Sequence, residues 1–214
     1  MPFVKKIETE NGIIGIWELT DSTDSLIANF RFSENEEAEF KKFSFKKRQS
    51  EYLATRLLLQ QLLNEKTEII YLKSGRPQII NSSLNISLSH SADLLVIFIS
   101  ANQVGIDVEK VNRNIQPVAK RFLHKDELAW IEKSENIQNS MILYWSAKEA
   151  IYKCCNQSGV QFDTQIYIPP FEFGKTNFFN GKLTTQNRQE NYNLWYFYFQ
   201  NNIIVYCVEV KNNS

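Results

Sequence analysis

The longest helix expected from the sequence contains the stretch Trp145-Ser146-Ala147-Lys148-Glu149-Ala150-Ile151-Tyr152-Lys153. It lies within residues 136–155, a run without the glycine or proline that would interrupt a helix. At about 3.6 residues per turn, Trp145, Glu149 and Lys153 project from one helix face. An exposed i,i+4 ion pair is the ordinary interpretation of Glu149 and Lys153. A functional face is the alternative, because the aromatic-rich segment 141–145 just before them has to be largely buried.

The composition is that of a folded chain with balanced charge. Of the 214 residues, 43% are hydrophobic, which is enough for one large domain or two small ones. The 24 basic and 24 acidic residues cancel, which argues against a dedicated nucleic-acid binder. Three cysteines without a metal-ligand spacing indicate a reducing compartment and no structural zinc. The N-terminus has no apolar signal core and no apolar run could span a membrane, so we expect a soluble, cytoplasmic protein.

Apolar and polar periodicity predicts the same kinds of element in both halves of the chain. In the first half we expect a helix starting at Ser33, a long helix at 46–65, and strands at 13–19, 68–73, 78–80, 85–91 and 94–101. In the second half we expect helices at 117–123, 125–133 and 136–155, and extended segments at 104–109, 166–173, 182–185, 194–200 and 203–210. Hairpins are expected at 102–103 and 201–202. The sequence therefore predicts an α+β protein of two similar halves, 1–102 and 103–214, each with a long helix on a small, mainly antiparallel sheet.

A pair of carboxylates marks the strand expected at 104–109. Asp107 and Glu109 point to one face of this strand, about 7 Å apart at Cα, while Ile106 and Val108 point to the core. Neighbouring carboxylates repel each other unless a cation lies between them. Oxygen ligands without His or Cys select Mg²⁺, Mn²⁺ or Ca²⁺ rather than zinc. The pair predicts a site for such a cation, with a merely solubilising pair as the alternative.

A second polar group lies at the end of the strand expected at 85–91. Ser89 and His90 there suit an anion such as a phosphate monoester, although a lone histidine is more often structural. A Ser-His-Asp triad is disfavoured, because the sequence lacks the G-x-S-x-G nucleophile elbow. Basic side chains at the start of the helix at 46–65 reinforce the positive end of its dipole, so a bound phosphate would relieve their repulsion. These basic residues are Lys41, Lys42, Lys46, Lys47 and Arg48, with Arg56 one to two turns further on.

In their order and spacing, these segments resemble the 4'-phosphopantetheinyl transferases, in the monomeric, pseudo-dimeric branch of the surfactin-synthetase-activating type. Three motifs carry the resemblance: Gly105-Ile106-Asp107-Val108-Glu109, then Arg121-Phe122-Leu123 with Glu127, then the stretch 145–153. Gly75-Arg76-Pro77 and residues 86–90 resemble two upstream motifs. The resemblance covers about residues 43–162, and the two ends of the chain carry no recognisable motif.

The resemblance implies an activity, and a role for each matching residue. The family transfers the phosphopantetheine arm of coenzyme A to a serine of an acyl or peptidyl carrier protein and releases 3',5'-ADP. Asp107 and Glu109 would hold Mg²⁺, with Glu149 as a third ligand, as the base for the serine proton, or as both. Lys153 would neutralise charge on the pyrophosphate. The 3'-phosphate and adenine end would be held by Arg76, Ser89 and His90, helped by Lys47, Arg48 and Arg56.

The resemblance also implies a pseudo-twofold monomer, with the coenzyme A site at the seam of its halves. The expected partners are coenzyme A and a carrier protein, without nucleic acid or membrane. A basic and apolar strip after the strand at 104–109 is the expected docking surface for the carrier, unless its apolar members are core. The strip consists of Arg113, Lys120, Arg121, Phe122, Leu123 and Lys125.

Two other functions stay open at this point. One is a non-catalytic module that binds coenzyme A or a carrier, which would not need a base such as Glu149. The other is a Mg²⁺-dependent phosphohydrolase, which would use water in place of the serine.

Overall fold

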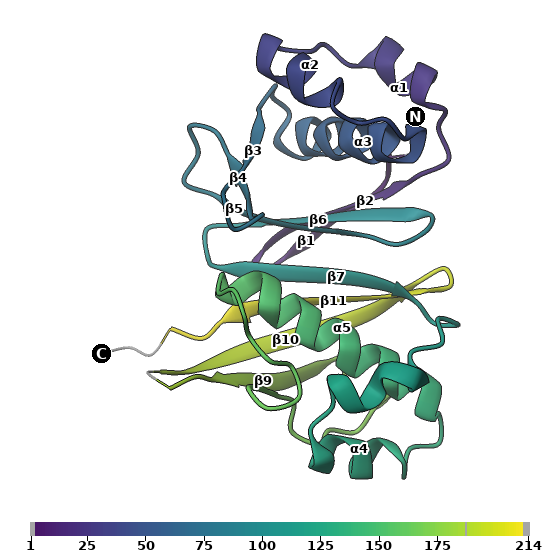
Figure 1. The fold of residues 1–214 in the computed structure, drawn as a ribbon, viewed down its shortest axis with the longest axis vertical. Coiled ribbons are helices and arrows are strands. Elements are labelled where there is room, and N and C mark those ends of the chain that lie inside the picture. Colours follow the sequence, from purple (N-terminus) through teal and green to yellow (C-terminus); the bar gives the residue numbers. More distant parts are fainter. Residues whose placement is uncertain (1–2, 187, 212–214) are drawn as a thin grey trace. The chain divides into compact units, whose positions relative to one another are not determined.

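The chain divides between Ala101 and Asn102 into two units, and in each of them a long helix packs on an antiparallel sheet (Figure 1). The computed structural model describes residues 3–186 and 188–211. Helices and antiparallel sheets in both units confirm the α+β class. The second unit begins one residue before the expected C-terminal half. The pseudo-twofold relation of the halves stays a prediction.

The first unit is built on a four-stranded antiparallel sheet with the strand order β1-β2-β6-β5. Its strands are β1 (Phe3–Thr9), β2 (Gly12–Glu18), β5 (Asn85–His90) and β6 (Leu94–Ser100). Helix α3 (Lys46–Leu63) packs on β2 and β6, where its leucines share a core with Trp17, Leu95 and Ile97. Strand β6 is buried along its whole length, as its uninterrupted apolar sequence predicts.

Short elements complete the first unit: α1 (Thr23–Asn29), α2 (Glu34–Phe40), β3 (Ile69–Tyr71) and β4 (Pro77–Ile79). Helix α2 begins after Ser33, as expected, because Ser33 and Glu36 form a capping box. The backbone N–H of Glu36 donates to Ser33 Oγ at 3.3 Å, and that of Ser33 donates to Glu36 Oε2 at 3.0 Å. The box holds the Glu36 carboxylate in the interior, where the residue is only 3% exposed.

The second unit has a five-stranded antiparallel sheet with the strand order β7-β11-β10-β9-β8. Its strands are β7 (Val104–Lys110), β8 (Ile166–Tyr167), β9 (Phe178–Thr184), β10 (Gln189–Phe199) and β11 (Asn202–Glu209). Helix α5 (Ile137–Cys155) packs on β7 and β11 (Figure 1). The approach is very close at Gly105, where an added Cβ would lie 1.8 Å from the carbonyl oxygen of Ala150. A side chain at position 105 would therefore push α5 away from β7.

A buried ion pair links α5 to the short helix α4 (Lys125–Ile131), which follows the 3₁₀ helix η1 (Gln116–Arg121). Lys148 Nζ lies 2.7 Å from Glu127 Oε2, and both side chains have 0% exposure. The ammonium also donates to the carbonyl oxygens of Phe162 and Ile166, at 2.8 and 2.7 Å. The carboxylate also accepts from two backbone N–H groups, each at 2.7 Å. Each buried charge thus has several hydrogen-bond partners, which is what burial of a charge requires.

Several expectations about local structure are wrong. The hairpin expected at 102–103 does not form, because β6 pairs with β2 and β5 whereas β7 pairs with β11. The second hairpin turns at Gln200–Asn201 rather than at 201–202, with Gln200 in the left-handed region at φ 49°. The extended segment expected at 166–173 is a strand only in β8. Strand β1 was not expected, because its largely exposed residues alternate too little.

The longest helices of the described chain, α3 and α5, have 18 and 19 residues. Within residues 3–186 and 188–211, none of the helices combines the length and the apolar character that a membrane crossing requires.

Candidate active site

Strand β7 presents the two carboxylates on which the candidate site is built. Asp107 is 4% exposed and Glu109 is partly exposed. Ile106 and Val108, which alternate with them, are buried. Burial does not alternate along the strand, since residues 104–108 are all buried, and Asp107 is more deeply enclosed than an ordinary surface carboxylate.

Helix α5 brings a lysine and a third carboxylate to this strand. Lys153 Nζ donates to Asp107 Oδ1 at 2.8 Å and to the carbonyl oxygen of Ile106 at 3.1 Å. Glu149 lies one turn earlier on the same helix and is half-buried. The Gly105 contact allows this approach, because only backbone separates the helix from the strand there. Lys153 therefore makes an ion pair across to the strand, whereas the i,i+4 spacing alone suggests one along the helix.

Glu109 is held by two residues that sequence reasoning did not assign to it. Trp145 Nε1 donates to Glu109 Oε1 at 3.0 Å. Arg113 forms an ion pair with the same oxygen, and its guanidinium lies 5.5 Å from the centre of the Trp145 ring. The spacing from Glu109 to Arg113 does not by itself predict a contact, because β7 ends between these two residues. Trp145 was placed by the sequence on the helix face of Glu149 and Lys153, and its hydrogen bond to Glu109 connects that face to β7.

The electrostatics of these carboxylates reflect burial and mutual repulsion. Burial raises the pKa of Glu149 to about 7, the negative charge of Asp107 adds to the rise, and the Lys153 ammonium opposes it. Burial is also the main cause that raises the pKa of Glu109, followed by the charge of Asp107. The Arg113 guanidinium opposes that second rise. When all three carboxylates are ionised, their negative charge therefore exceeds the positive charge of Lys153 and Arg113.

The donor set has the chemistry of a site for a hard divalent cation. The pKa values of Glu109 and Glu149 are raised in part by neighbouring negative charge, so added positive charge would stabilise their ionised forms. In the structure, the Lys153 ammonium on Asp107 and the Arg113 guanidinium on Glu109 stand in for such a charge. Across residues 3–186 and 188–211, no three His, Cys, Asp or Glu side chains are grouped so that they could hold a metal ion. Carboxylates are the residue type that binds Mg²⁺. A bound Mg²⁺ would have to displace the Lys153 ammonium from Asp107 and the Arg113 guanidinium from Glu109.

A cavity of about 730 Å³ lies in the first unit, with Arg48 and His90 among its lining residues. Both contact the carboxylate of Glu51, which is buried. Arg48 Nη1 lies 2.9 Å from Glu51 Oε2, and His90 Nδ1 lies 3.6 Å from Glu51 Oε1. Arg48 Nη1 is also 3.4 Å from His90 Nε2. Two of the residues expected to bind phosphate thus meet at one cavity.

Glu51 was missed in the sequence, although a signal for it was present. It lies three and four residues after Arg48 and Lys47, so all three share one face of α3. Lys47 Nζ is 3.9 Å from its carboxylate, and the lysine side chain is 67% exposed. Lys47 therefore points mostly to solvent, while Arg48 lines the cavity.

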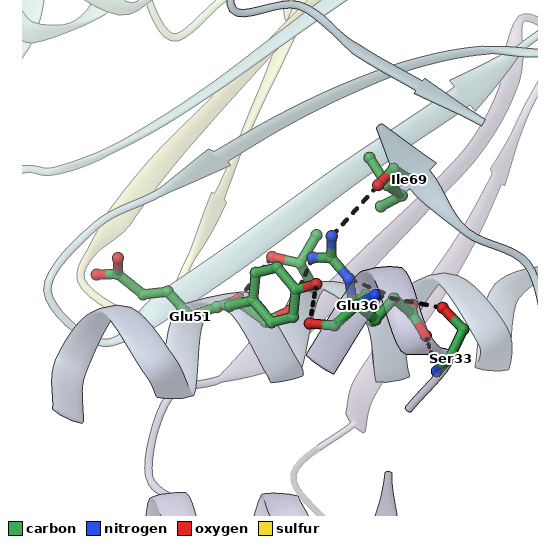
Figure 2. A network of polar contacts seen from close by, with 7 residues as sticks. Ser33, Glu36, Glu51 and Ile69 are labelled. Atoms are coloured by element: carbon green, nitrogen blue, oxygen red, sulfur yellow. Dashed lines mark hydrogen bonds and ion pairs between the residues drawn. The ribbon is translucent and has the colours of Figure 1, made fainter. Parts of the chain in front are cut away.

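Arg56 is buried and is engaged within the first unit. Its Nε is 3.4 Å from Glu36 Oε1, and it donates to the carbonyl oxygens of Tyr52 and Ile69, each at 3.3 Å. The guanidinium lies 3.3 Å from the centre of the Tyr52 ring. In Figure 2, Ser33 and Glu36 lie together at one end of this network and Glu51 lies at the other. Arg56 therefore ties α2, α3 and β3 together at the inner wall of the cavity.

The other residues expected near the nucleotide are spread over the first unit. Ser89 is 7% exposed and Ser87 is 4% exposed, so both hydroxyl side chains of β5 are buried. His90 alternates with Ser89 and has a partly exposed side chain. Arg76 lies between β3 and β4, with Nη2 3.5 Å from Asn85 Oδ1. Their roles toward a nucleotide stay predictions.

The strip expected to dock a carrier has a different make-up in the structure. Phe122 and Leu123 are 2% and 5% exposed and belong to the core of the second unit. Arg113 is engaged with Glu109. The rest of the strip is exposed and basic, and consists of Lys120, Arg121 and Lys125.

A carboxylate pair on a strand, faced by a glutamate and a lysine on a helix, is an arrangement suited to phosphoryl transfer. Residues 103–207 contain all of these side chains and match the family described as the 4'-phosphopantetheinyl transferase superfamily. This part of the chain is therefore similar to that superfamily over its whole length.

The chain is also similar to individual proteins. The chain is 29% identical over 123 residues to the 4'-phosphopantetheinyl transferase gsp of Aneurinibacillus migulanus, which covers 56% of this chain and 48% of that protein. It is 30% identical over 112 residues to the 4'-phosphopantetheinyl transferase AcpT of Salmonella typhimurium strain LT2, covering 50% of this chain and 58% of that one. The chain spans about half the length of the curated relatives that it matches. Among solved structures, the holo-[acyl-carrier-protein] synthase of Thermotoga maritima aligns with 51% of this chain and 64% of its own, at 17% identity and a TM-score of 0.38.

Proposed function

We propose that the protein transfers the 4'-phosphopantetheine arm of coenzyme A to a serine of an acyl or peptidyl carrier protein, with Mg²⁺, and releases 3',5'-ADP. The observation that carries the proposal is the convergence of Asp107, Glu109, Glu149 and Lys153 in the part of the chain that matches the transferase superfamily. Phosphoryl transfer asks a protein for positioning and charge neutralisation, which these side chains supply.

The serine hydroxyl needs a base, and Glu149 is the proposed one. The serine oxygen forms a bond to the phosphorus that carries the pantetheine arm, and the bond from that phosphorus to the bridging oxygen of the pyrophosphate breaks. The bridging oxygen leaves with 3',5'-ADP, and the serine proton passes to Glu149. A carboxyl with a pKa of about 7 is ionised in a large share of molecules at neutral pH and still holds a proton well, which suits general base catalysis.

Positive charge in the site stabilises the pyrophosphate as the bond breaks. Lys153 already lies on the strand next to Asp107 and would turn its ammonium to the phosphate oxygens. Asp107 and Glu109 would hold Mg²⁺, with Glu149 as a third ligand if it does not act only as the base. When bound, the ion would neutralise the charge that develops on the phosphate oxygens.

The nucleotide end of coenzyme A is the proposed occupant of the cavity in the first unit. Arg48 and His90 lie together at that cavity, where a 3'-phosphate would bind the Arg48 guanidinium and accept a hydrogen bond from the His90 ring. Arg56 would shape the inner wall rather than reach the ligand, since its guanidinium is engaged with Glu36 and backbone carbonyls. Lys47, Ser89 and Arg76 complete the proposed set.

The test is incubation with coenzyme A, Mg²⁺ and an apo carrier protein, with the mass of the intact carrier measured. We expect a gain equal to one phosphopantetheine group. Asp107→Ala and Glu149→Gln should each abolish the gain, while Glu132→Gln, which changes an exposed carboxylate on α4's C-terminal side, should leave it unchanged.

The same experiment separates the other two functions. Binding of coenzyme A without a mass gain on any of several carriers would indicate a non-catalytic module. Release of 3',5'-ADP without a carrier would indicate a phosphohydrolase. Near-full transfer by Glu149→Gln would show that this residue is not the base.

A further inference from the structure

Arg113 contacts the candidate site, although it lies beyond the end of the strand that carries the carboxylates. Its backbone N–H donates to the carbonyl oxygen of Lys110 at 3.0 Å, which turns the chain back toward Glu109. Its own carbonyl oxygen accepts a hydrogen bond from the side chain of Gln138 on α5. The backbone of Arg113 is therefore held in place, while its side chain stays 48% exposed.

Glu109 Oε1 receives two donors of different chemistry. One is the neutral indole N–H of Trp145, at 3.0 Å. The indole is fixed by its packing, with Phe122 edge-on at 5.1 Å between ring centres and Phe162 at 6.0 Å. The other donor is the charged guanidinium of Arg113, which is half exposed and can swing into solvent.

The two donors have separable consequences for a cation that binds Glu109. The indole orients the carboxylate without cancelling its charge, and it leaves the second carboxylate oxygen for another ligand. The guanidinium cancels the charge and repels a divalent cation nearby. The first contact favours cation binding, and the second opposes it.

We propose that Arg113 is an internal counter-ion of Glu109 that a divalent cation has to displace, while Trp145 is the positioning residue that keeps Glu109 oriented. The proposal rests on the proposed function only in taking Asp107 and Glu109 as cation ligands. Arg113 thus sets the cation concentration at which the site fills, without touching the substrate.

The test is direct binding of Mn²⁺, measured from the electron paramagnetic resonance signal of the free ion, without coenzyme A or carrier. Arg113→Ala should bind Mn²⁺ roughly threefold to tenfold more tightly than the wild type, because an exposed ion pair is lost and a repulsive charge removed. Trp145→Phe keeps an aromatic ring but loses the donor, and should bind it roughly threefold to tenfold more weakly. The opposite signs are the signature of the proposal, since a purely structural defect would weaken binding in both variants.

Matched variants complete the experiment. Lys133→Ala removes one exposed positive charge on the C-terminal side of α4 and should leave the Mn²⁺ affinity unchanged. Arg113→Lys keeps the charge and should stay close to the wild type. Asp107→Asn should abolish binding and so identify the ions held at the site.

Unchanged or weaker binding by Arg113→Ala would overturn the proposal, as would an equal gain in Lys133→Ala. Mn²⁺ binding that Asp107→Asn does not affect would overturn it too, since the ion would lie elsewhere. If the opposite shifts are found but no carrier gains mass, the proposed transfer is wrong and the role of Arg113 stands.

Discussion

Two lysines on helix α5 make ion pairs with carboxylates from other elements, and their surroundings differ. Lys148 and Glu127 have 0% exposure, and each is also hydrogen-bonded to backbone groups. The side chains of Lys153 and Asp107 are 27% and 6% exposed and lie beside two more carboxylates. The first pair, called the closed pair below, is shielded from solvent. The second, called the open pair, is partly exposed to solvent.

The difference separates structural from functional charge within one helix. Burial raises the pKa of Glu127 and lowers that of Lys148, and the pair persists because each partner and several backbone groups oppose that effect. Around Lys153, negative charge is in excess, and the pKa of Glu149 is raised to about 7. The closed pair fastens α4 to α5, whereas the open pair is ready to exchange partners.

The largest expected effect is on the closed pair. Glu127→Ala should lower the free energy of unfolding by about 3–5 kcal/mol, because it leaves the Lys148 ammonium buried without its counter-ion. Urea denaturation followed by circular dichroism measures this loss. Glu132→Ala on the exposed side is the control and should change stability by less than about 0.5 kcal/mol. Similar losses in both variants would contradict the contrast between the pairs.

The next effect is on the open pair, where the substitution should affect activity much more than stability. Lys153→Ala should reduce the rate of carrier modification about 100-fold, because charge on the pyrophosphate is no longer neutralised. Its stability should change by only about 1 kcal/mol, since the side chain is partly exposed. Measuring the initial rate and the urea midpoint on one preparation tests both statements. A loss of stability as large as that of Glu127→Ala would remove the distinction.

The smallest effect concerns the stability of protein freed of divalent cations with EDTA. The pKa of Glu149 is raised from its ordinary 4.5 to about 7, so between these values the folded state holds a proton that the unfolded state has released. Stability should therefore fall as the pH rises from about 5 to 8. Glu149→Gln should flatten this decline and be about 1–2 kcal/mol more stable than the wild type near pH 8, after allowance for solvent screening. Urea titrations at both ends of the range measure the slopes, and parallel slopes would show that the carboxyl keeps its ordinary pKa.

Local patterns explain what could be predicted of the fold. The uninterrupted run of β6, the Ser33 cap of α2 and the long helices α3 and α5 follow from periodicity and capping. The pairing of β7 with β11 does not, because strands about a hundred residues apart leave no local signal. An adjacent strand therefore seemed the natural partner.

In the candidate site, too, local spacing could be predicted from the sequence and long-range contacts could not. Asp107, Glu109, Glu149 and Lys153 stand out by their spacing on one strand and one helix. The contact of Trp145 with Glu109 joins residues 36 positions apart, and the partner of Lys148 lies on another helix. Glu51 could have been found from its helical spacing to Arg48, but its burial depends on how α3 packs on its sheet.

The contact at Gly105 has a consequence for anyone who redesigns this protein. Strand β7 and helix α5 are in backbone contact there, so a change of side-chain rotamer cannot alter the distance between the two elements. Widening it by a single methyl group would shift Asp107 and Glu109 together relative to Glu149 and Lys153. Transfer of these four side chains to another scaffold therefore requires moving the strand and the helix together as one unit. Adaptation to a bulkier substrate has to come from changes in the surrounding loops.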